Sequence, residues 1–425
     1  MIERIVKLLN ENNGVSDYRI NTVARTSYEL FFVHRDLETV RSTETVETKV
    51  TVFSAHNGKL GDATFTVYSS YTDEKIAEEI QTALGKAELV DNEPYALPAN
   101  ETGEFVSDSN MGEADLPELG AAIADAVFAA DCYENGSINA LEVFVYRDTV
   151  RVCNSRGIDK TEIKYSAMAE AIPTWNSPDE SVELYECHNF TELDREAIRE
   201  EIDSKMREVR DRSLAKKPEE QPDCRVVLAA PELRELFGEI AYNLTFAGLY
   251  RHANAYKVGD EIQKDRTGDA LTLTARGRMK GSVESAAFDD DGFTMRDRCI
   301  IQNGVAKACF GSVRFASYVG EKPTGALRCI EVDVGTLGEG ELCSEPYFRC
   351  ASMSGLQVDI YNDYIGGEVR LGYYFDGARE IPVTGISISG KLSACLSGMR
   401  LSDTETVYES YKGPKYAAFG GIEIV

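Results

Sequence analysis

The feature of the sequence that most constrains its fold is a pattern of strands and a helix that occurs twice in the first half of the chain. Residues 17–88 contain three strand-like runs followed by a helical segment, and residues 141–214 contain four such runs followed by another. Each helical segment follows a threonine, Thr72 or Thr191, of the type that caps the free N–H groups of a first turn. Strand meanders covered by helices form α+β domains. We therefore expect an N-terminal α+β domain made of two repeated units.

The expected strands of these units are rich in β-branched and aromatic residues. They lie at 28–35, 44–54 and 63–68 in the first unit and at 141–146, 149–154, 162–172 and 181–187 in the second. Between the units, residues 88–111 are rich in Asn, Pro and acids and predict a loop, and the Ala-rich residues 116–131 predict a helix. The domain is expected to cover residues 1–215, with units at about 1–110 and 111–215.

The second half of the chain has a different pattern. A segment rich in charge and proline, residues 214–223 (LAKKPEEQPD), reads as an interdomain linker. A strand is expected at 225–229, followed by a helix at 231–247 whose apolar residues recur at helical spacing. After residue 269, short strands alternate with Asn-Gly and Asp-Gly turns, which is typical of hairpins. Residues 222–425 are therefore expected to form a mostly antiparallel β domain that begins with this strand and helix.

Composition excludes several classes of function. The chain of 425 residues carries 72 acidic and 45 basic residues, a net charge of −27 that repels the phosphates of nucleic acids. No run approaches the ~20 apolar residues of a membrane span, and residues 1–11 form an amphipathic pattern unlike an export signal. The ten cysteines include no Cys-x-x-Cys pair, which favours reduced thiols. We expect a cytoplasmic protein that binds neither nucleic acids nor membranes.

Short motifs identify no catalytic or metal-binding residue. The turn 288–292 (FDDDG) lacks EF-hand spacing, and we interpret it as a charged turn. The chain has no Gly-x-x-x-x-Gly-Lys-Ser/Thr phosphate loop and no Gly-x-Ser-x-Gly sequence. None of the four histidines stands at ligand spacing from another; they are His34, His56, His188 and His252. A zinc site assembled from distant residues, or a cysteine nucleophile, stays open as an alternative.

Five segments in a consistent order span nearly the whole chain. They are 153–157 (CNSRG), 226–228 (VVL) before the helix, 287–292 (AFDDDG), the pair 301–307 and 323–328 (IQNGVAK and PTGALR), and 376–390 (DGAREIPVTGISISG). In this order they resemble the TldD/PmbA family, once described as modulators of DNA gyrase and now regarded as zinc metallopeptidases and their partner subunits.

The resemblance breaks down at the metal site. Peptidase members of the family carry His-Glu-x-x-x-His on the helix that corresponds to residues 231–247. This sequence places Gly238 and Asn243 at the two histidine positions and keeps only Glu239. A glycine has no side-chain ligand, and an amide is a poor ligand for zinc. The sequence therefore resembles the PmbA or TldE type of subunit, in which these three positions form a degenerate motif that supplies neither metal nor catalytic residues.

This resemblance implies a heteromeric peptidase. A TldD-like subunit would carry the zinc, and this chain would be its non-catalytic partner, in a homo- or hetero-oligomer that acts on unfolded or modified peptides. Glu239 would be a remnant of a residue that polarises zinc-bound water. Two alternatives remain: a peptidase in its own right with a non-standard site, and a regulatory interaction protein similar to a gyrase modulator. Whether the chain is an enzyme stays open.

Overall fold

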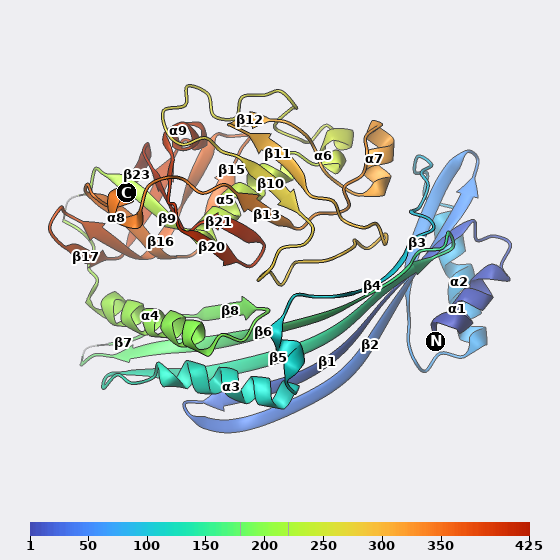
Figure 1. Ribbon diagram of the computed structural model, residues 1–425, viewed down its shortest axis with the longest axis horizontal. Coiled ribbons are helices and arrows are strands. Elements are labelled where there is room, and N and C mark those ends of the chain that lie inside the picture. Colours follow the sequence, from blue (N-terminus) through green and yellow to red (C-terminus); the bar gives the residue numbers. More distant parts are fainter. Residues whose placement is uncertain (179, 220) are drawn as a thin grey trace.

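The computed structural model describes residues 1–178, 180–219 and 221–425. One long, curved sheet of eight strands dominates the first part of the chain (Figure 1). Its strands are β1 (Asp17–Val33), β2 (Asp36–His56), β3 (Lys59–Val67), β4 (Thr102–Val106), β5 (Gly136–Asn154), β6 (Asp159–Asn176), β7 (Ser181–Glu183) and β8 (Glu186–Phe190). Their order is β3-β2-β1-β5-β6-β4, with β7 and β8 also paired to β6.

The helices of this part pack at the two ends of the sheet (Figure 1). They are α1 (Ile2–Asn10), α2 (Asp73–Ala87), α3 (Leu116–Ala129), α4 (Arg195–Leu214) and the short 3₁₀ helix η1 (Asn110–Glu113). One apolar core joins α1 and α2 to β1–β3, and a second joins α3 and α4 to β5 and β6. We call this sheet and its helices the N-terminal half.

The two predicted units merge into this single sheet, because β1 pairs antiparallel with β5 along its length. The strands expected at 141–146 and 149–154 are wrong as separate elements, since β5 runs unbroken through them. The reason lies at Asp148, whose carboxylate accepts two hydrogen bonds from Arg25, at 2.7 and 2.6 Å, across the strand pair. The charged residues therefore extend the ladder and do not form a turn.

Two other local predictions need correction. The loop expected at 88–111 contains β4, which adds a parallel strand to β6, because its alternating side chains suit a sheet edge. Thr72 caps α2 as expected, its hydroxyl accepting a hydrogen bond from the Lys75 amide. Thr191 does not cap α4. Asp194 does, because its carboxylate accepts bonds from two amides of the first turn.

The second part of the chain, which we call the C-terminal half, contains two sheets. The strands are β9 (Arg225–Ala229), β10 (Leu273–Arg276), β11 (Arg298–Gln302), β12 (Val305–Ala306), β13 (Cys329–Val332), β14 (Tyr347–Met353), β15 (Gln357–Asp359), β16 (Tyr364–Phe375), β17 (Glu380–Val383), β18 (Ile386–Gly390), β19 (Arg400–Leu401), β20 (Glu405–Tyr408), β21 (Tyr411–Pro414), β22 (Tyr416–Phe419) and β23 (Ile422–Ile424). Six form the sheet β12-β11-β10-β13-β21-β20, and nine form the other, around β16.

Most pairs in the C-terminal half are antiparallel, and β9–β14 and β13–β21 are parallel. Its helices are α5 (Ala230–Tyr242), α6 (Phe246–Arg251), α7 (Val313–Val319), α8 (Glu339–Leu342) and α9 (Leu392–Gly398). The buried face of α5 belongs to one large core with residues of both sheets. The α+β class expected from the sequence, with a mostly antiparallel C-terminal part, is confirmed. No helix in the described part of the chain is long and apolar enough to cross a membrane.

The helix expected at 231–247 is in fact two helices. α5 ends at Tyr242, because the Asn243 side chain donates a hydrogen bond to the carbonyl of Glu239 at 3.1 Å and replaces the next turn. Thr245 then caps α6. Of the linker expected at 214–223, residue 220 lies outside the described residues, and Lys216 forms a β-bridge with Val383.

A buried turn fixes the two halves against each other. The turn at 287–292 reaches the N-terminal sheet, where Asp291 pairs with Arg19 and the Asn21 side chain donates to the Asp290 carbonyl at 2.8 Å. Lys160 of β6 donates to the Gly292 carbonyl at 2.8 Å. The predicted charged turn is therefore a structural junction, since Asp289 and Asp291 are only 3% and 8% exposed.

Candidate functional site

Two of the three positions predicted to form a degenerate motif, Gly238 and Glu239, lie on the partly exposed side of α5. The helix buries one apolar side in the core, which contains Leu233, Leu236, Phe237, Ile240 and Ala241. Gly238 and Glu239 lie on the other side, between the exposed Glu235 and Tyr242. A Cβ added at Gly238 would meet no atom within 4 Å, so the surface beside this glycine is open.

Asn243 is buried and holds three hydrogen bonds. Its amide nitrogen donates to the carbonyl oxygen and to the carboxylate Oε1 of Glu239, both at 3.1 Å. Its Oδ1 accepts a bond from the Ala255 amide at 3.1 Å. These contacts tie the end of α5 to the segment that follows α6, and they tie Glu239 to its own helix. Asn243 therefore has a structural role at the end of α5.

The residues around the motif do not fit a zinc ion. Across residues 1–178, 180–219 and 221–425, no three His, Cys, Asp or Glu side chains come close enough together to hold a metal. The four histidines lie apart. His34 occupies the β1–β2 turn, His56 contacts Asp91, His188 is in β8 and His252 ends α6. Gly238, Glu239 and Asn243 therefore have no such group of side chains beside them in the described part of the chain.

The open surface at Gly238 gives a simple prediction. Gly238→Ala is expected to raise the free energy of unfolding by about 0.5–1 kcal/mol, because alanine restricts the unfolded chain and favours helix. Gly85 in α2 is a matched control, since a Cβ there also meets no atom within 4 Å. Urea unfolding of both variants should give similar gains. A loss confined to Gly238→Ala would contradict the open surface.

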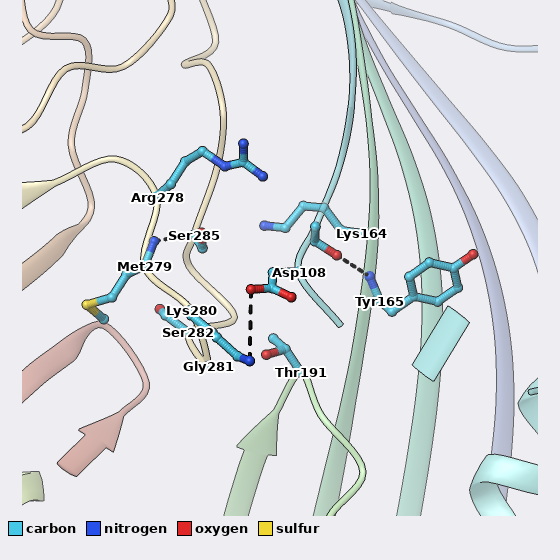
Figure 2. A pocket seen from close by; sticks show the side chains of 11 residues that line it. Asp108, Lys164, Tyr165, Thr191, Arg278, Met279, Lys280, Gly281, Ser282 and Ser285 are labelled. Carbon is cyan, nitrogen blue, oxygen red and sulfur yellow. Dashed lines mark hydrogen bonds and ion pairs between the residues drawn. The ribbon is translucent and has the colours of Figure 1, made fainter. Parts of the chain in front are cut away.

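A cleft runs between the two halves and contains three adjoining cavities. The largest, about 510 Å³, is lined by α4, β8, β20 and the first turn of α5. A second, about 450 Å³, shares Asn189 and Glu409 with it. A third, about 180 Å³, shares Gly281 with the largest (Figure 2). The sequence did not predict this cleft, because its walls come from segments far apart in the chain.

Buried charges line the largest cavity. The Lys205 ammonium lies 3.3 Å from Glu186 and 3.1 Å from Glu208. Burial disfavours its charge, but the attraction of Glu208 and Glu186 outweighs burial and raises its pKa. Burial also raises the pKa of Glu186, and that of Glu232 at the start of α5, each to about 7. The pKa values of two carboxyl groups of the cleft therefore lie near neutral pH.

Glu232 makes stability depend on pH. Its pKa rises from 4.5 in an unfolded chain to about 7 on folding. The stability that the protonated carboxyl gives the folded protein is therefore fully present below pH 4.5 and is lost as the pH rises through 7. Glu232→Gln stays neutral and is expected to be more stable than the parent at pH 8 by on the order of 3 kcal/mol. Urea unfolding should show this advantage disappearing at pH 4.5. Glu235→Gln, on the exposed side of the same helix, controls for the substitution, and an advantage of Glu232→Gln that does not change with pH would contradict the assignment.

This chain is similar to known proteins both in the sequence of its C-terminal half and in its overall fold. Residues 221–424 match the model of the PmbA/TldA metallopeptidase C-terminal domain. The structure of TldE from Thermococcus kodakarensis superposes with a TM-score of 0.81 at 15% identity, covering 100% of this chain and 99% of that one. A protein of Thermotoga maritima described as a candidate modulator of a DNA gyrase gives 0.79 at 16% identity, covering 100% of both chains.

A third structure, a candidate modulator of DNA gyrase from Bacteroides thetaiotaomicron, superposes with a TM-score of 0.77 at 14% identity and covers 99% of this chain and 97% of its own. The curated protein sequences contain no significant match. These structural likenesses describe the fold, and the match at residues 221–424 adds the sequence relationship. By its sequence, the C-terminal half of this chain belongs to the TldD/PmbA family, and the whole chain has the fold of these three structures.

Proposed function

We propose that this chain is the non-catalytic partner subunit of a TldD-like zinc metallopeptidase that acts on unfolded or modified peptides. The observation that carries the proposal is the set of residues at the end of helix α5. The resemblance places Gly238 and Asn243 at the positions of the family's two histidines. The side-chain amide of Asn243 is already hydrogen-bonded to Glu239 and to the Ala255 amide. The likeness in fold to a protein described as TldE supports the same assignment.

The proposal includes a division of the chain and a location. Residues 1–215 would be an N-terminal domain with units at about 1–110 and 111–215, and residues 222–425 a C-terminal domain. The cleft between them would face the peptide or the partner. The cysteines of the described chain are all free, which suits the reducing cytoplasm that we propose for the complex.

The first experiment tests association. The purified chain is mixed with a TldD-like subunit from the same source, and mass and cleavage of an unfolded peptide are followed. We expect a complex whose chelator-sensitive cleavage differs from that of the TldD-like subunit alone. Absence of both association and any change in cleavage would refute the proposal.

Glu239→Gln in this chain then separates a silent subunit from an active one. The glutamine keeps an oxygen that can accept the Asn243 bond, so the fold should be preserved. If Glu239 is a remnant, the complex with Glu239→Gln cleaves at the rate of the unmodified complex. If Glu239 were a general base, the rate would fall by about 10²- to 10⁴-fold.

A second candidate, a regulatory interaction protein, is favoured by the description of the Thermotoga and Bacteroides relatives as candidate gyrase modulators. The association experiment distinguishes the two. A regulator of gyrase would bind gyrase without a TldD-like subunit and would leave peptide cleavage unchanged.

A further inference from the structure

The smallest cavity of the cleft has an unusual charge for this chain. It lies between the loop at 278–285 of the C-terminal half and, in the N-terminal half, β6 and the residues that directly follow β4 and β8 (Figure 2). In a chain with 72 acidic and 45 basic residues, its lining holds three basic side chains and one acidic one. The basic residues are Lys164, Arg278 and Lys280, and the acidic residue is Asp108.

Two of these cations have no acidic partner. The Lys164 ammonium donates to the Val283 carbonyl at 3.1 Å, and the Arg278 guanidinium donates to the Val106 carbonyl at 3.2 Å. Within the described chain, no carboxylate oxygen lies within 4.0 Å of either group, whereas Lys280 has Glu192 at 3.0 Å and Asp108 at 3.9 Å. Figure 2 shows Lys164 and Arg278 extending toward each other from opposite walls. The cavity therefore holds two cations that form no ion pair with any carboxylate of the described residues.

A buried hydroxyl in the same cavity also lacks a partner. Thr191 is 6% exposed, and its Oγ1 has no hydrogen-bond partner among the described residues. Its oxygen turns toward the loop that carries Lys280 (Figure 2). Buried polar atoms are nearly always paired, so an exception calls for a water, ion or ligand that completes it. Thr191 is thus a second observation, independent of charge, that indicates a ligand.

Two serines add donors. The Ser107 oxygen accepts a bond from the Tyr165 amide at 3.3 Å, and the Ser285 oxygen accepts one from the Met279 amide at 2.9 Å. Both hydroxyl hydrogens are therefore free to be donated to a ligand. At about 180 Å³ the cavity has room for a compact group only. An oxyanion matches this set, since cations and hydroxyls all donate to it.

We propose that this cavity is a binding site for a compact oxyanion, held by Lys164, Arg278 and the hydroxyl of Thr191. The anion is the C-terminal carboxylate of a peptide. This choice of source rests on the proposed function, because a peptide in the cleft would reach the cavity from the adjoining ones. The anion site itself rests only on the geometry of this chain.

Calorimetric titration of the full chain, without any partner, tests the site. The probes are inorganic phosphate and an N-acetylated unfolded peptide, prepared with a free C-terminal carboxylate and as the C-terminal amide. We expect the carboxylate peptide to bind at least about 10-fold more tightly than the amide, because charged hydrogen bonds are lost with the amide. Phosphate should compete, and added salt should weaken both. Phosphate binding without discrimination between the peptides would support the site and overturn the peptide source.

Three variants decide whether the named residues form the site. Lys164→Met and Arg278→Met should each weaken binding of phosphate and of the carboxylate peptide by about 10-fold or more. Thr191→Val should weaken binding without lowering the melting temperature, because it removes an unpaired buried hydroxyl, so its loss of binding is not a loss of fold. Lys264→Met, at an exposed position, is the control for charge. Unchanged affinity in all three variants, or no anion binding by the parent, would overturn the site and leave the proposed function to its own association test.

Discussion

Lys160→Met is expected to lower the free energy of unfolding by about 3–5 kcal/mol, because each hydrogen bond of a charged group contributes about 1.5–3 kcal/mol and the substitution removes several of them. Lys160 is 1% exposed, and its ammonium donates to Glu101 at 2.5 Å, to the Gly292 carbonyl at 2.8 Å and to the Thr294 hydroxyl at 2.6 Å. Methionine fills similar space but leaves the Gly292 carbonyl without this donor. Because the bonds reach from β6 into the junction turn, the loss should loosen the contact between the halves.

Urea unfolding at pH 7 measures this effect. Lys75→Met serves as control, because the Lys75 ammonium makes its ion pairs with Glu78 and Glu79 on the surface of α2. Its unfolding midpoint should stay close to that of the parent. If Lys160→Met behaved like this control, the bonds of Lys160 across the junction would not stabilise the protein.

Asp289→Ala should have an effect of similar size at the same junction. The Asp289 carboxylate is 3% exposed and accepts hydrogen bonds, each at 3.0 Å, from the amides of Asp291, Phe293 and Ala326. We expect a loss of about 3–5 kcal/mol, because each buried donor left without a partner costs about 1–3 kcal/mol. Thermal or urea unfolding at pH 7 provides the measurement.

The neighbouring residue gives a matched control. The Asp290 side chain is 78% exposed, and its one ion pair among the described residues is with Arg328, at 3.4 Å. Asp290→Ala should therefore change stability by less than about 0.5 kcal/mol. The contrast between these adjacent aspartates is the expected result. Equal effects at both positions would show that the acidity of the turn matters, and not its hydrogen bonds.

The fold was predictable where one local pattern decides the structure. The strand expected at 225–229 is β9, with the same bounds. The apolar spacing of residues 233–241 correctly gave the buried face of α5. Prediction failed where a contact with a residue distant in sequence determines the local structure. Arg25, far along the chain, keeps β5 continuous at Asp148, and no local pattern contains that contact.

Part of the candidate site could likewise be predicted from the sequence, and part could not. The resemblance to the family predicts that Gly238 and Asn243 stand at two histidine positions, but the bond from the Ala255 amide to Asn243 depends on how the chain returns after α6. The charged residues of the cleft were missed for a related reason. Lys164, Lys205 and Glu232 look like ordinary surface residues in sequence, and only the packing of the two halves encloses them.

The zinc content of the purified chain, measured alone and together with its peptide hydrolysis, tests the central claim most directly. A silent partner subunit should contain far less than one zinc per chain and should show no chelator-sensitive cleavage until a TldD-like subunit is added. Zinc bound at one ion per chain by this protein alone, with cleavage that chelator abolishes, would contradict the account.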